Sequence, residues 1–309
     1  MQEKSKVIIA ATGGLGNQLF QVAAALSFSK LSPISIDQNL FNNSNKDIFD
    51  FIPAQRVKIV PFKEVGWVNR KLANGLLRAS RGTKSAHPKD WSPNKYRRVA
   101  SYLLNKRYCK DYEVFSPSEI GFDPNFQLRD QGALLIGYFQ SYKWFESSKV
   151  KELFGLQETS KSKAFETLKK SAEISKPIIL HVRLGDYVSS KDLGILPAKY
   201  YKEALSKLRP VLNKDEVWVF SNETIKVEEF LPRESGYKFK VIDTELTPAQ
   251  TLELMRYGSA YIIGNSTFSW WAAFLKYDRN ARVFYPSTWF RQINRANMMH
   301  PIDWEALEI

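Results

Sequence analysis

Short apolar runs alternate with amphipathic helical patterns along the sequence, which predicts an α/β protein with helices on both faces of parallel sheets. The chain has 309 residues, of which 44% are hydrophobic, and this is enough for two domains with cores of their own. No apolar run approaches the roughly 18 residues that a membrane-spanning helix needs. The single cysteine, Cys109, excludes an intrachain disulfide. We therefore expect a cytoplasmic protein without a signal peptide.

The first part of the sequence, residues 1–158, is predicted to form one domain. A helix follows its first strand to about residue 30, and residues 142–154 have helical spacing. The expected strands are 7–11, 34–37, 56–60 and 134–139.

The alternation is cleaner in residues 159–290, which predicts a second domain and a cleft between the two. The Lys-rich stretch 160–176 is the expected boundary, and 291–309 is expected to be a C-terminal tail. The expected strands are 178–182, 216–220, 239–242, 261–263 and, as the final strand, 282–285. The expected helices are 197–208, 248–257 and 268–275.

Positive charge is concentrated in one segment. The chain carries 45 Lys and Arg residues against 32 Asp and Glu residues, a net charge of +13. Residues 67–110 hold twelve of the basic residues and one acidic residue, Asp90, so this segment alone carries +11. This distribution argues against a nucleic-acid binder with charge spread along a groove.

The basic segment is predicted to be a helical insertion in the first domain. Apolar residues recur at helical spacing around Leu72 and Leu76, and again around Leu103, with a polar stretch between. We expect two short amphipathic helices joined by an exposed loop. Three interpretations are open: a helical pair with a solvated face, a docking site for an anionic membrane, and a nucleic-acid patch.

A glycine-rich turn, Gly13-Gly14-Leu15-Gly16-Asn17-Gln18, follows the first strand and opens a helix. Such a turn exposes backbone N–H groups to an anion. A dinucleotide site is one alternative, because Asp37 ends the next strand about 20 residues on. Leu19, however, stands where that fingerprint requires Gly or Ala. A purely structural turn is the other alternative, although the Asn17 and Gln18 amides suit sugar hydroxyls or phosphate oxygens.

The motif His181-Val182-Arg183-Leu184-Gly185-Asp186 ends a predicted strand, where α/β sheets bind ligands. An arginine there offers a fork of donors to phosphate oxygens, and a histidine adds a hydrogen bond or a proton. A local Arg183–Asp186 ion pair and a satisfied core histidine are equally open.

A cluster of hydroxyl and amide side chains precedes the predicted helix at 268–275. Hydroxyls at a helix start cap that helix or bind an anion, and capping alone needs one of them. The cluster consists of Asn265, Ser266, Thr267 and Ser269.

Together these segments resemble glycosyltransferase family 11, the α-1,2-fucosyltransferases. The resemblance lies in GGLGNQLFQ at 13–21, GYFQSYKWF at 137–145, HVRLGDYV at 181–188, GNSTFSWWAAFL at 264–275 and FYPSTWF at 284–290. It implies a GT-B architecture, in which two Rossmann-like domains face each other across a cleft. It also implies that the first domain binds the acceptor and the second binds GDP-fucose, with inversion at fucose C1.

The resemblance assigns roles to the candidate residues. Arg183 is expected to stabilise the departing β-phosphate with help from His181, and Asn17 is expected beside the reacting centre. Asp186 is the local candidate for a base. The donor-binding candidates are Arg183, His181, Asn265, Ser266, Thr267, Ser269, Gly14, Gly16 and Glu223.

The distribution of aspartates in the sequence affects the predictions for metal binding and for guanosine binding. No Asp-x-Asp motif occurs in the chain, so we expect no metal and no cofactor besides the donor substrate. The family commonly has two aspartates after the strand that ends here at Phe220, where this chain has Ser221-Asn222-Glu223. It often has an aspartate near the start of the predicted helix at 248–257, where this chain has Thr251. Glu223 can still accept a hydrogen bond from guanine or ribose.

The sequence thus predicts a metal-independent inverting α-1,2-fucosyltransferase that acts on galactose-terminated glycans in a bacterium. The expected partners are GDP-fucose, a galactoside acceptor and an anionic membrane that contacts residues 67–110; no nucleic acid is expected. The alternatives are an α/β protein that binds a nucleotide or sugar without transferring it, and a Rossmann NAD-dependent oxidoreductase.

Overall fold

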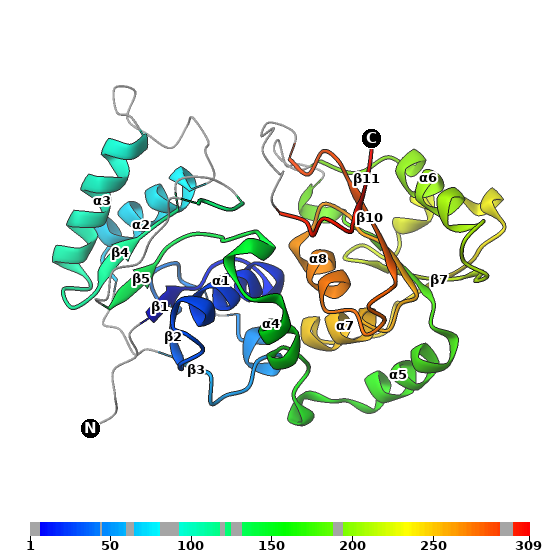
Figure 1. Ribbon diagram of the computed structural model, residues 1–309, viewed down its shortest axis with the longest axis horizontal. Coiled ribbons are helices and arrows are strands. Elements are labelled where there is room, and N and C mark those ends of the chain that lie inside the picture. Colours follow the sequence, from blue (N-terminus) through cyan, green and yellow to red (C-terminus); the bar gives the residue numbers. More distant parts are fainter. Residues whose placement is uncertain are drawn as a thin grey trace. The chain divides into compact units, whose positions relative to one another are not determined.

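The computed structural model describes residues 7–43, 45–59, 65–80, 93–117, 121–124, 132–187, 194–290 and 299–309. The chain divides into two compact units: unit 1 is Met1–Phe154 with Asn297–His300, and unit 2 is Gly155–Ala296 with Pro301–Ile309. Each unit has one parallel sheet with its own helices (Figure 1). The predicted α/β class with two Rossmann-like units is therefore confirmed. Among the described residues, no helix is long and apolar enough to cross a membrane.

The sheet of unit 1 has the strand order β3-β2-β1-β5-β4, and all of its neighbouring strands run parallel. The strands are β1 (Val7–Ala10), β2 (Ile34–Asp37), β3 (Val57–Ile59), β4 (Glu113–Phe115) and β5 (Ala133–Leu135). The central strand β1 is buried along its whole length, as expected for a parallel strand covered on both faces. Strand β4 escaped prediction because Val114 is its only fully buried residue, so no apolar run marks it.

Four α-helices and two 3-10 turns complete the described part of unit 1. Helix α1 follows the glycine turn, and its small residues Ala23, Ala24 and Ala25 are fully buried. The helices are α1 (Leu15–Phe28), α2 (Trp67–Ala79), α3 (Pro93–Arg107) and α4 (Ser147–Leu153), and the turns are η1 (Asp47–Asp50) and η3 (Tyr142–Trp144).

The two helices predicted in the basic segment are present as α2 and α3. Their apolar residues, among them Leu76 and Leu104, pack in one cluster with Ile8 of β1 and Leu134 of β5. The two helices therefore cover one face of the sheet, and the described residues of the basic segment contribute to the core of unit 1. Most of the predicted connecting loop lies outside the described residues.

Helices α2 and α3 approach each other closely at one glycine. A Cβ atom at Gly75 would lie 1.7 Å from the hydroxyl oxygen of Tyr96 on the neighbouring helix. The absence of a side chain at position 75 is thus what allows the Tyr96 ring to lie there.

The sheet of unit 2 has the strand order β11-β10-β9-β6-β7-β8, again with all neighbouring strands parallel. The five strands predicted for this region are present, with ends that differ by at most one residue. The strands are β6 (Ile178–Val182), β7 (Glu216–Ser221), β8 (Lys238–Val241), β9 (Ala260–Ile262), β10 (Arg282–Pro286) and β11 (Glu305–Leu307).

The prediction that 282–285 is the final strand, followed by a tail, was wrong. Strand β11 lies beside β10, with Phe284 in register with Glu305. The Arg282 guanidinium also donates to the Glu305 carboxylate, with 2.8 Å from Nε to Oε1. A three-residue edge strand with one fully buried residue, Leu307, shows no apolar periodicity in the sequence.

Helix α6 covers one face of this sheet. Tyr200 and Leu205 of α6 share a core with Leu180 of β6 and Val219 of β7. The α-helices of unit 2 are α5 (Lys163–Ser175), α6 (Ala198–Leu208), α7 (Pro248–Met255) and α8 (Thr267–Phe274). Its 3-10 turns are η4 (Glu158–Ser160), η5 (Gly185–Tyr187), η6 (Val227–Phe230) and η7 (Arg233–Ser235).

The Lys-rich stretch that was expected to separate the domains is helix α5, and the division falls earlier, between Phe154 and Gly155. Ser162 caps this helix, because its hydroxyl accepts a hydrogen bond from the Phe165 N–H at 3.2 Å. Lys163 and Lys170 are exposed on α5, so the lysines of this stretch belong to a helix and not to a linker.

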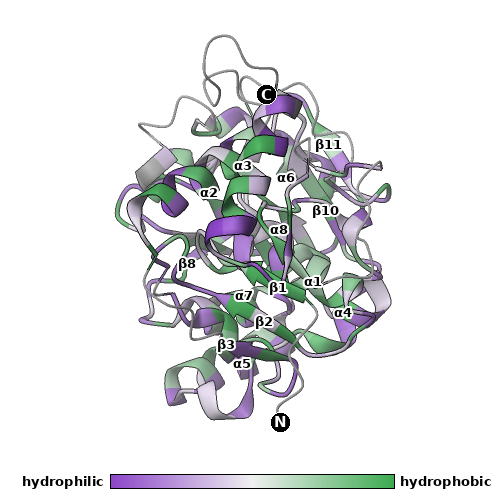
Figure 2. Cartoon of the chain, turned by 90° about the vertical axis from the view of Figure 1, so that its left-hand side faces the viewer, coloured by the Kyte–Doolittle hydropathy of each residue, from purple (hydrophilic) through white to green (hydrophobic). Residues whose placement is uncertain are grey.

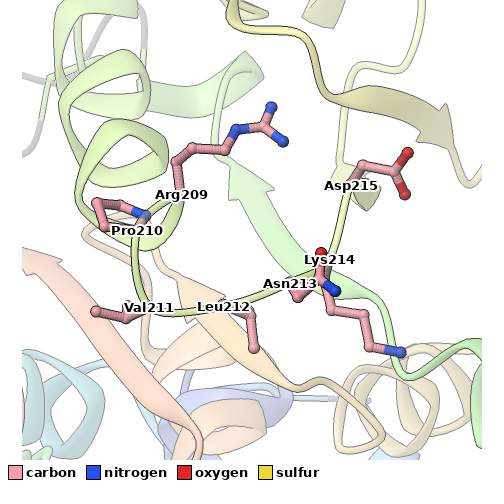
Figure 3. Close-up of a pocket in the computed structure, with 7 residues that line it drawn as sticks. All are labelled: Arg209, Pro210, Val211, Leu212, Asn213, Lys214 and Asp215. Carbon is pink, nitrogen blue, oxygen red and sulfur yellow. The ribbon is translucent and has the colours of Figure 1, made fainter.

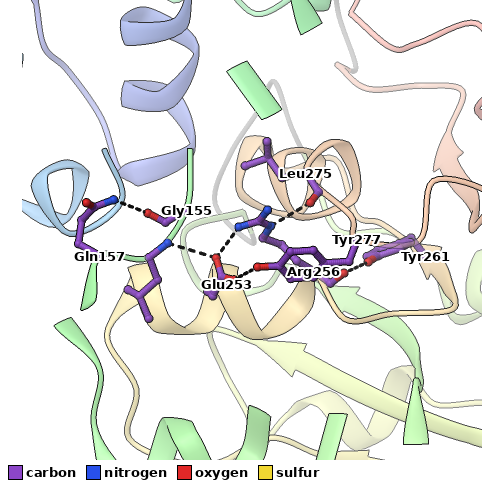
Figure 4. A network of polar contacts seen from close by, with 8 residues as sticks. Gly155, Gln157, Glu253, Arg256, Tyr261, Leu275 and Tyr277 are labelled. Carbon is purple, nitrogen blue, oxygen red and sulfur yellow. Dashed lines mark hydrogen bonds and ion pairs between the residues drawn. The ribbon is translucent and has the colours of Figure 1, made fainter. Parts of the chain in front are cut away.

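A buried ion pair links the first residues of unit 2 to helix α7 and to the end of α8 (Figure 4). Arg256 and Glu253 are 8% and 7% exposed, with 2.6 Å between Nη1 and Oε2. The same carboxylate accepts from the Leu156 N–H at 3.2 Å and from the Tyr277 hydroxyl. The Arg256 Nε–H donates to the Leu275 carbonyl at 2.9 Å, at the end of α8. One pair therefore joins the first residues of the unit to α7 and α8.

We predict that Glu253→Ala lowers the free energy of unfolding of unit 2 by about 3 kcal/mol or more, because Arg256 would remain buried without its carboxylate. Urea unfolding followed by tryptophan fluorescence measures this. The matched control is Glu228→Ala, which removes an exposed ion pair with Arg233 and should cost under about 1 kcal/mol. Equal losses in the two variants would contradict the assignment.

Candidate functional site

Three segments of unit 2 meet at one edge of its sheet. Strands β9, β6 and β7 are neighbours, and because they run parallel their carboxyl ends lie together. The residues that follow these ends are 264–269 after β9, 183–187 after β6 and 222–223 after β7. The predicted donor-binding residues of unit 2 fall in these segments or, like His181, in the strand beside them.

His181 lies in β6 and is almost fully buried, with 4% of its surface exposed. A Cβ atom at Gly264 would lie 3.4 Å from its Nδ1, so the neighbouring chain fits closely around the imidazole. Among the described residues, Nδ1 has no hydrogen-bond partner. Burial, with help from the positive charge of Arg183, lowers the His181 pKa to about 3. The imidazole is therefore neutral near pH 7, which favours a hydrogen-bonding role over the donation of a proton.

Arg183 immediately follows β6 and is half-buried. Its guanidinium carbon lies 5.2 Å from the centre of the Tyr187 ring, which is within the range of a cation–π contact. The Tyr187 hydroxyl in turn donates to the Asn265 carbonyl at 3.2 Å. The arginine is thus positioned by a ring that is itself tied to the segment after β9. The side chain of Asp186 is not described, so its predicted roles stay predictions.

Asn222, which was not among the predicted site residues, supports the turn that carries Arg183. Its Oδ1 accepts a hydrogen bond from the Leu184 N–H at 2.9 Å. Gly185 has a φ of +57°, and a Cβ there would lie 2.5 Å from Asn222 Nδ2. The signal in the sequence was a polar residue directly after a strand that neighbours β6.

Glu223 lies next to Asn222 and forms an ion pair with Lys226, with 3.3 Å between Oε2 and Nζ. Its side chain is 35% exposed, so both water and Lys226 reach the carboxylate. The predicted contact with guanine or ribose stays a prediction.

The cluster at the start of α8 is largely engaged within the protein. Ser266 caps the helix, with 3.4 Å from the Phe268 N–H to its Oγ, and Ser269 Oγ lies 3.2 Å from the Ser266 carbonyl oxygen. The Asn265 amide donates to the Gly194 carbonyl at 3.3 Å. Capping therefore accounts for Ser266, and main-chain contacts account for Asn265 and Ser269. Thr267 is the half-buried member of the cluster, at the first helical position.

The glycine turn of unit 1 is also built around amides. Gly13 has a φ of +76°, and a Cβ there would lie 2.5 Å from Asn17 Nδ2. The Asn17 Oδ1 accepts a hydrogen bond from Gln140 Nε2 at 3.0 Å, and Gln18 Nε2 donates to the Gly13 carbonyl at 3.0 Å. Gln140 belongs to the motif at 137–145, so the structure brings two of the recognised motifs together.

The predicted site residues thus form two groups. Asn17, Gly14 and the buried Gly16 lie at the start of α1 in unit 1. The remaining candidates lie at the carboxyl edge of the sheet in unit 2.

Asp37, the acid of the dinucleotide alternative, is fully buried. Its carboxylate accepts from the Tyr108 hydroxyl at 2.7 Å and from the Asn39 and Leu40 N–H groups at 2.8 and 3.1 Å. Burial raises the Asp37 pKa, and these hydrogen bonds oppose the rise. A carboxylate enclosed in this way braces the loop after β2 and does not face a ribose.

A cavity of about 530 Å³ lies elsewhere on unit 2 (Figure 3). It is formed by the loop that enters β7, at the edge of the sheet opposite to the segments described above. Arg209 stacks there on the Tyr237 ring at 3.8 Å. The cavity is lined by Arg209, Pro210, Val211, Leu212, Asn213, Lys214 and Asp215. It holds none of the predicted site residues.

Two parallel α/β units with polar turns at the carboxyl ends of their strands are typical of proteins that bind nucleotides or nucleotide sugars. A profile of glycosyl transferase family 11 matches residues 125–307, more than half of the chain. The chain belongs to this family and is a glycosyltransferase. The family resemblance is therefore confirmed, and the oxidoreductase alternative is wrong.

The chain is also similar to individual proteins of bacteria. The chain is 27% identical to the O-antigen biosynthesis glycosyltransferase WbnK of Escherichia coli, over 93% of this chain and 96% of that protein. It is 25% identical to an alpha-1,2-colitosyltransferase of Escherichia coli, over 93% of each. Among solved structures, the fucosyltransferase NodZ from Bradyrhizobium aligns with a TM-score of 0.48 and 12% identity, over 89% of this chain and 93% of NodZ.

We predict that the imidazole NMR signals of His181 do not titrate between about pH 8 and pH 5, because its pKa is about 3. In the unfolded chain the pKa returns to about 6.5. The unfolded state therefore binds the proton first as the pH falls, and His181 lowers the free energy of unfolding between about pH 6.5 and pH 3. This loss should be smaller in His181→Gln. A titration midpoint near 6.5 in the folded protein would contradict the burial.

We predict that Asn222→Ala lowers the rate of sugar transfer about tenfold, because the turn that carries Arg183 loses its acceptor for the Leu184 N–H. Asn222→Asp retains an acceptor oxygen and should restore most of the rate. Initial rates and thermal unfolding are measured together, with Asn280→Ala as the exposed control. Full activity of Asn222→Ala would show that the turn does not need this contact.

Proposed function

We propose that this glycosyltransferase is an inverting α-1,2-fucosyltransferase that moves L-fucose from GDP-β-L-fucose to O2 of a terminal galactose. The observation that carries the proposal is the position of Arg183, directly after β6 and tied through Tyr187 to the segment that starts α8. A guanidinium that follows one strand and a helix N-terminus that follows the neighbouring strand can bind a diphosphate together. The five motifs shared with the fucosyltransferases of the family support the choice of sugar.

In the proposed reaction, the galactose O2 attacks fucose C1 on the face opposite GDP. The bond between C1 and the β-phosphate oxygen breaks, and its electron pair leaves with GDP. Arg183 would stabilise the negative charge that develops on the β-phosphate, together with the backbone N–H groups and Thr267 at the start of α8. The neutral His181 would contribute a hydrogen bond. We propose that the site works without a metal ion, since fixed donors can take the charge.

The acceptor half of the proposal rests on unit 1. Asn17 lies at the start of α1, and its side chain accepts a hydrogen bond from Gln140. The Asn17 amide is suited to sugar hydroxyls. We propose that Asn17 lies beside the reacting sugar and that the exposed Gly14 presents its backbone to the ligand, while the buried Gly16 supports the turn. Asp186 remains the proposed base for the proton of the acceptor hydroxyl.

A second nucleotide sugar is a candidate for the donor substrate. A relative is named as an alpha-1,2-colitosyltransferase, so GDP-colitose is the second candidate donor. The other relative acts in O-antigen biosynthesis, which supports a bacterial surface-polysaccharide precursor as the acceptor. We propose that the enzyme meets this precursor at the cytoplasmic side of the membrane.

The decisive experiment incubates the protein with GDP-fucose or GDP-colitose and a panel of galactosides, with and without EDTA, and determines the linkage of the product. We predict α-1,2-linked fucose, equal rates with EDTA, and a loss of about 100-fold or more in kcat for Arg183→Ala. Arg209→Ala, at the separate cavity, is the arginine control and should retain full activity. Transfer from GDP-colitose alone would replace the proposed donor, and GDP binding without transfer would support the non-catalytic alternative.

A further inference from the structure

The outer faces of α2 and α3 combine exposed aromatic residues with basic residues. On α3, Val99, Tyr102 and Leu103 are exposed, and they lie three and four residues apart on one stripe of the helix. On α2, Trp67 at the first helical position is 73% exposed, and the Lys71 ammonium lies 5.6 Å from its ring centre. These apolar side chains face solvent while the opposite sides of both helices pack in the core.

Basic residues lie on and beside the same stripes, and the helices α2 and α3 themselves contain no acidic residue. Asp90 is the only acidic residue in the sequence between 67 and 110, and it lies outside the described residues. The exposed bases include Lys71, Arg98, Lys106, Arg107 and Lys110. Both helices cover the same face of the sheet and contact each other at Gly75 and Tyr96, so their outer stripes share one side of unit 1 (Figure 2).

We propose that this side of unit 1, the outer faces of α2 and α3, docks on the surface of an anionic lipid bilayer. The basic residues would lie among the headgroups, and Trp67, Tyr102 and Leu103 would enter the boundary between headgroups and acyl chains. A single-stranded nucleic acid could stack its bases on Trp67 and Tyr102, but the exposed aliphatic side chains of Val99 and Leu103 offer it no stacking face. The apolar content of the stripes therefore favours a membrane over a nucleic acid.

The test is sedimentation of the whole protein with vesicles of phosphatidylcholine that contain about one third phosphatidylglycerol, compared with phosphatidylcholine alone. We expect binding to the anionic vesicles that weakens strongly between about 0.05 M and about 0.5 M salt. The variant Lys106→Gln/Arg107→Gln should lower the partition coefficient about 25-fold, at about fivefold for each charge removed.

The apolar contribution is tested separately. Trp67→Ser/Tyr102→Ser keeps every charge and should lower partitioning by about tenfold or more. The matched controls lie in other parts of the chain: Lys149→Gln/Lys199→Gln removes two exposed charges, and Ile225→Ser removes a side chain that is 93% exposed. Both controls should bind vesicles as the unchanged protein does.

Three results would overturn the proposal: no binding to anionic vesicles at low salt, an equal loss in the control variants, or retention on heparin without binding to vesicles. The proposal does not depend on the identity of the sugar donor, because vesicle binding is measured without a nucleotide sugar. Transfer to a soluble acceptor should be unchanged in all of these variants, so failure of the docking surface and failure of the proposed reaction are distinguishable.

Discussion

Parallel strand pairing is the constraint on which the rest of this structure depends. Every described strand pair in both sheets is parallel, so each sheet must be covered by helices on both faces and has its carboxyl ends at a single edge. In unit 2 this brings the ends of β9, β6 and β7 together, although they are far apart in the sequence. Arg183, Asn222 and the start of α8 are neighbours for this reason.

The polar residues at that edge hold the surrounding main chain in place. Ser266 caps α8, Asn222 holds the turn after β6, and Asn265 joins the segment after β9 to the main chain at Gly194. Several side chains that the sequence suggested as ligand-binding groups are therefore hydrogen-bonded within the protein. The anion site proposed above therefore relies on the Arg183 guanidinium, which lies 5.2 Å from the Tyr187 ring centre, and on the backbone N–H groups at the start of α8.

The sequence predicted the sheet of unit 2 well because long apolar runs such as Ile178–Val182 are buried on both faces. The sequence did not predict β4 or β11. Each of these strands has three residues and only one buried side chain, so no apolar run marks it. The sequence motifs predicted which segments form the candidate site, but they could not reveal which side chains hold other residues of the site in place. Asn222 acts on Leu184 across two strands, and Asp37 is enclosed by Tyr108 from a distant helix end. Such contacts depend on tertiary packing.

The contact between Gly75 and Tyr96 has an evolutionary consequence. A side chain at position 75 would occupy the place of the tyrosine ring, so the two positions can change only together. Homologues with a larger residue at 75 should have lost the ring at 96, and the inner side of the helix pair should diverge in coupled steps. The outer side has no such coupling, since its residues face solvent. If basic and apolar residues persist at these outer positions in distant homologues, an interaction with another molecule must be what selects for them, because the fold itself does not require them.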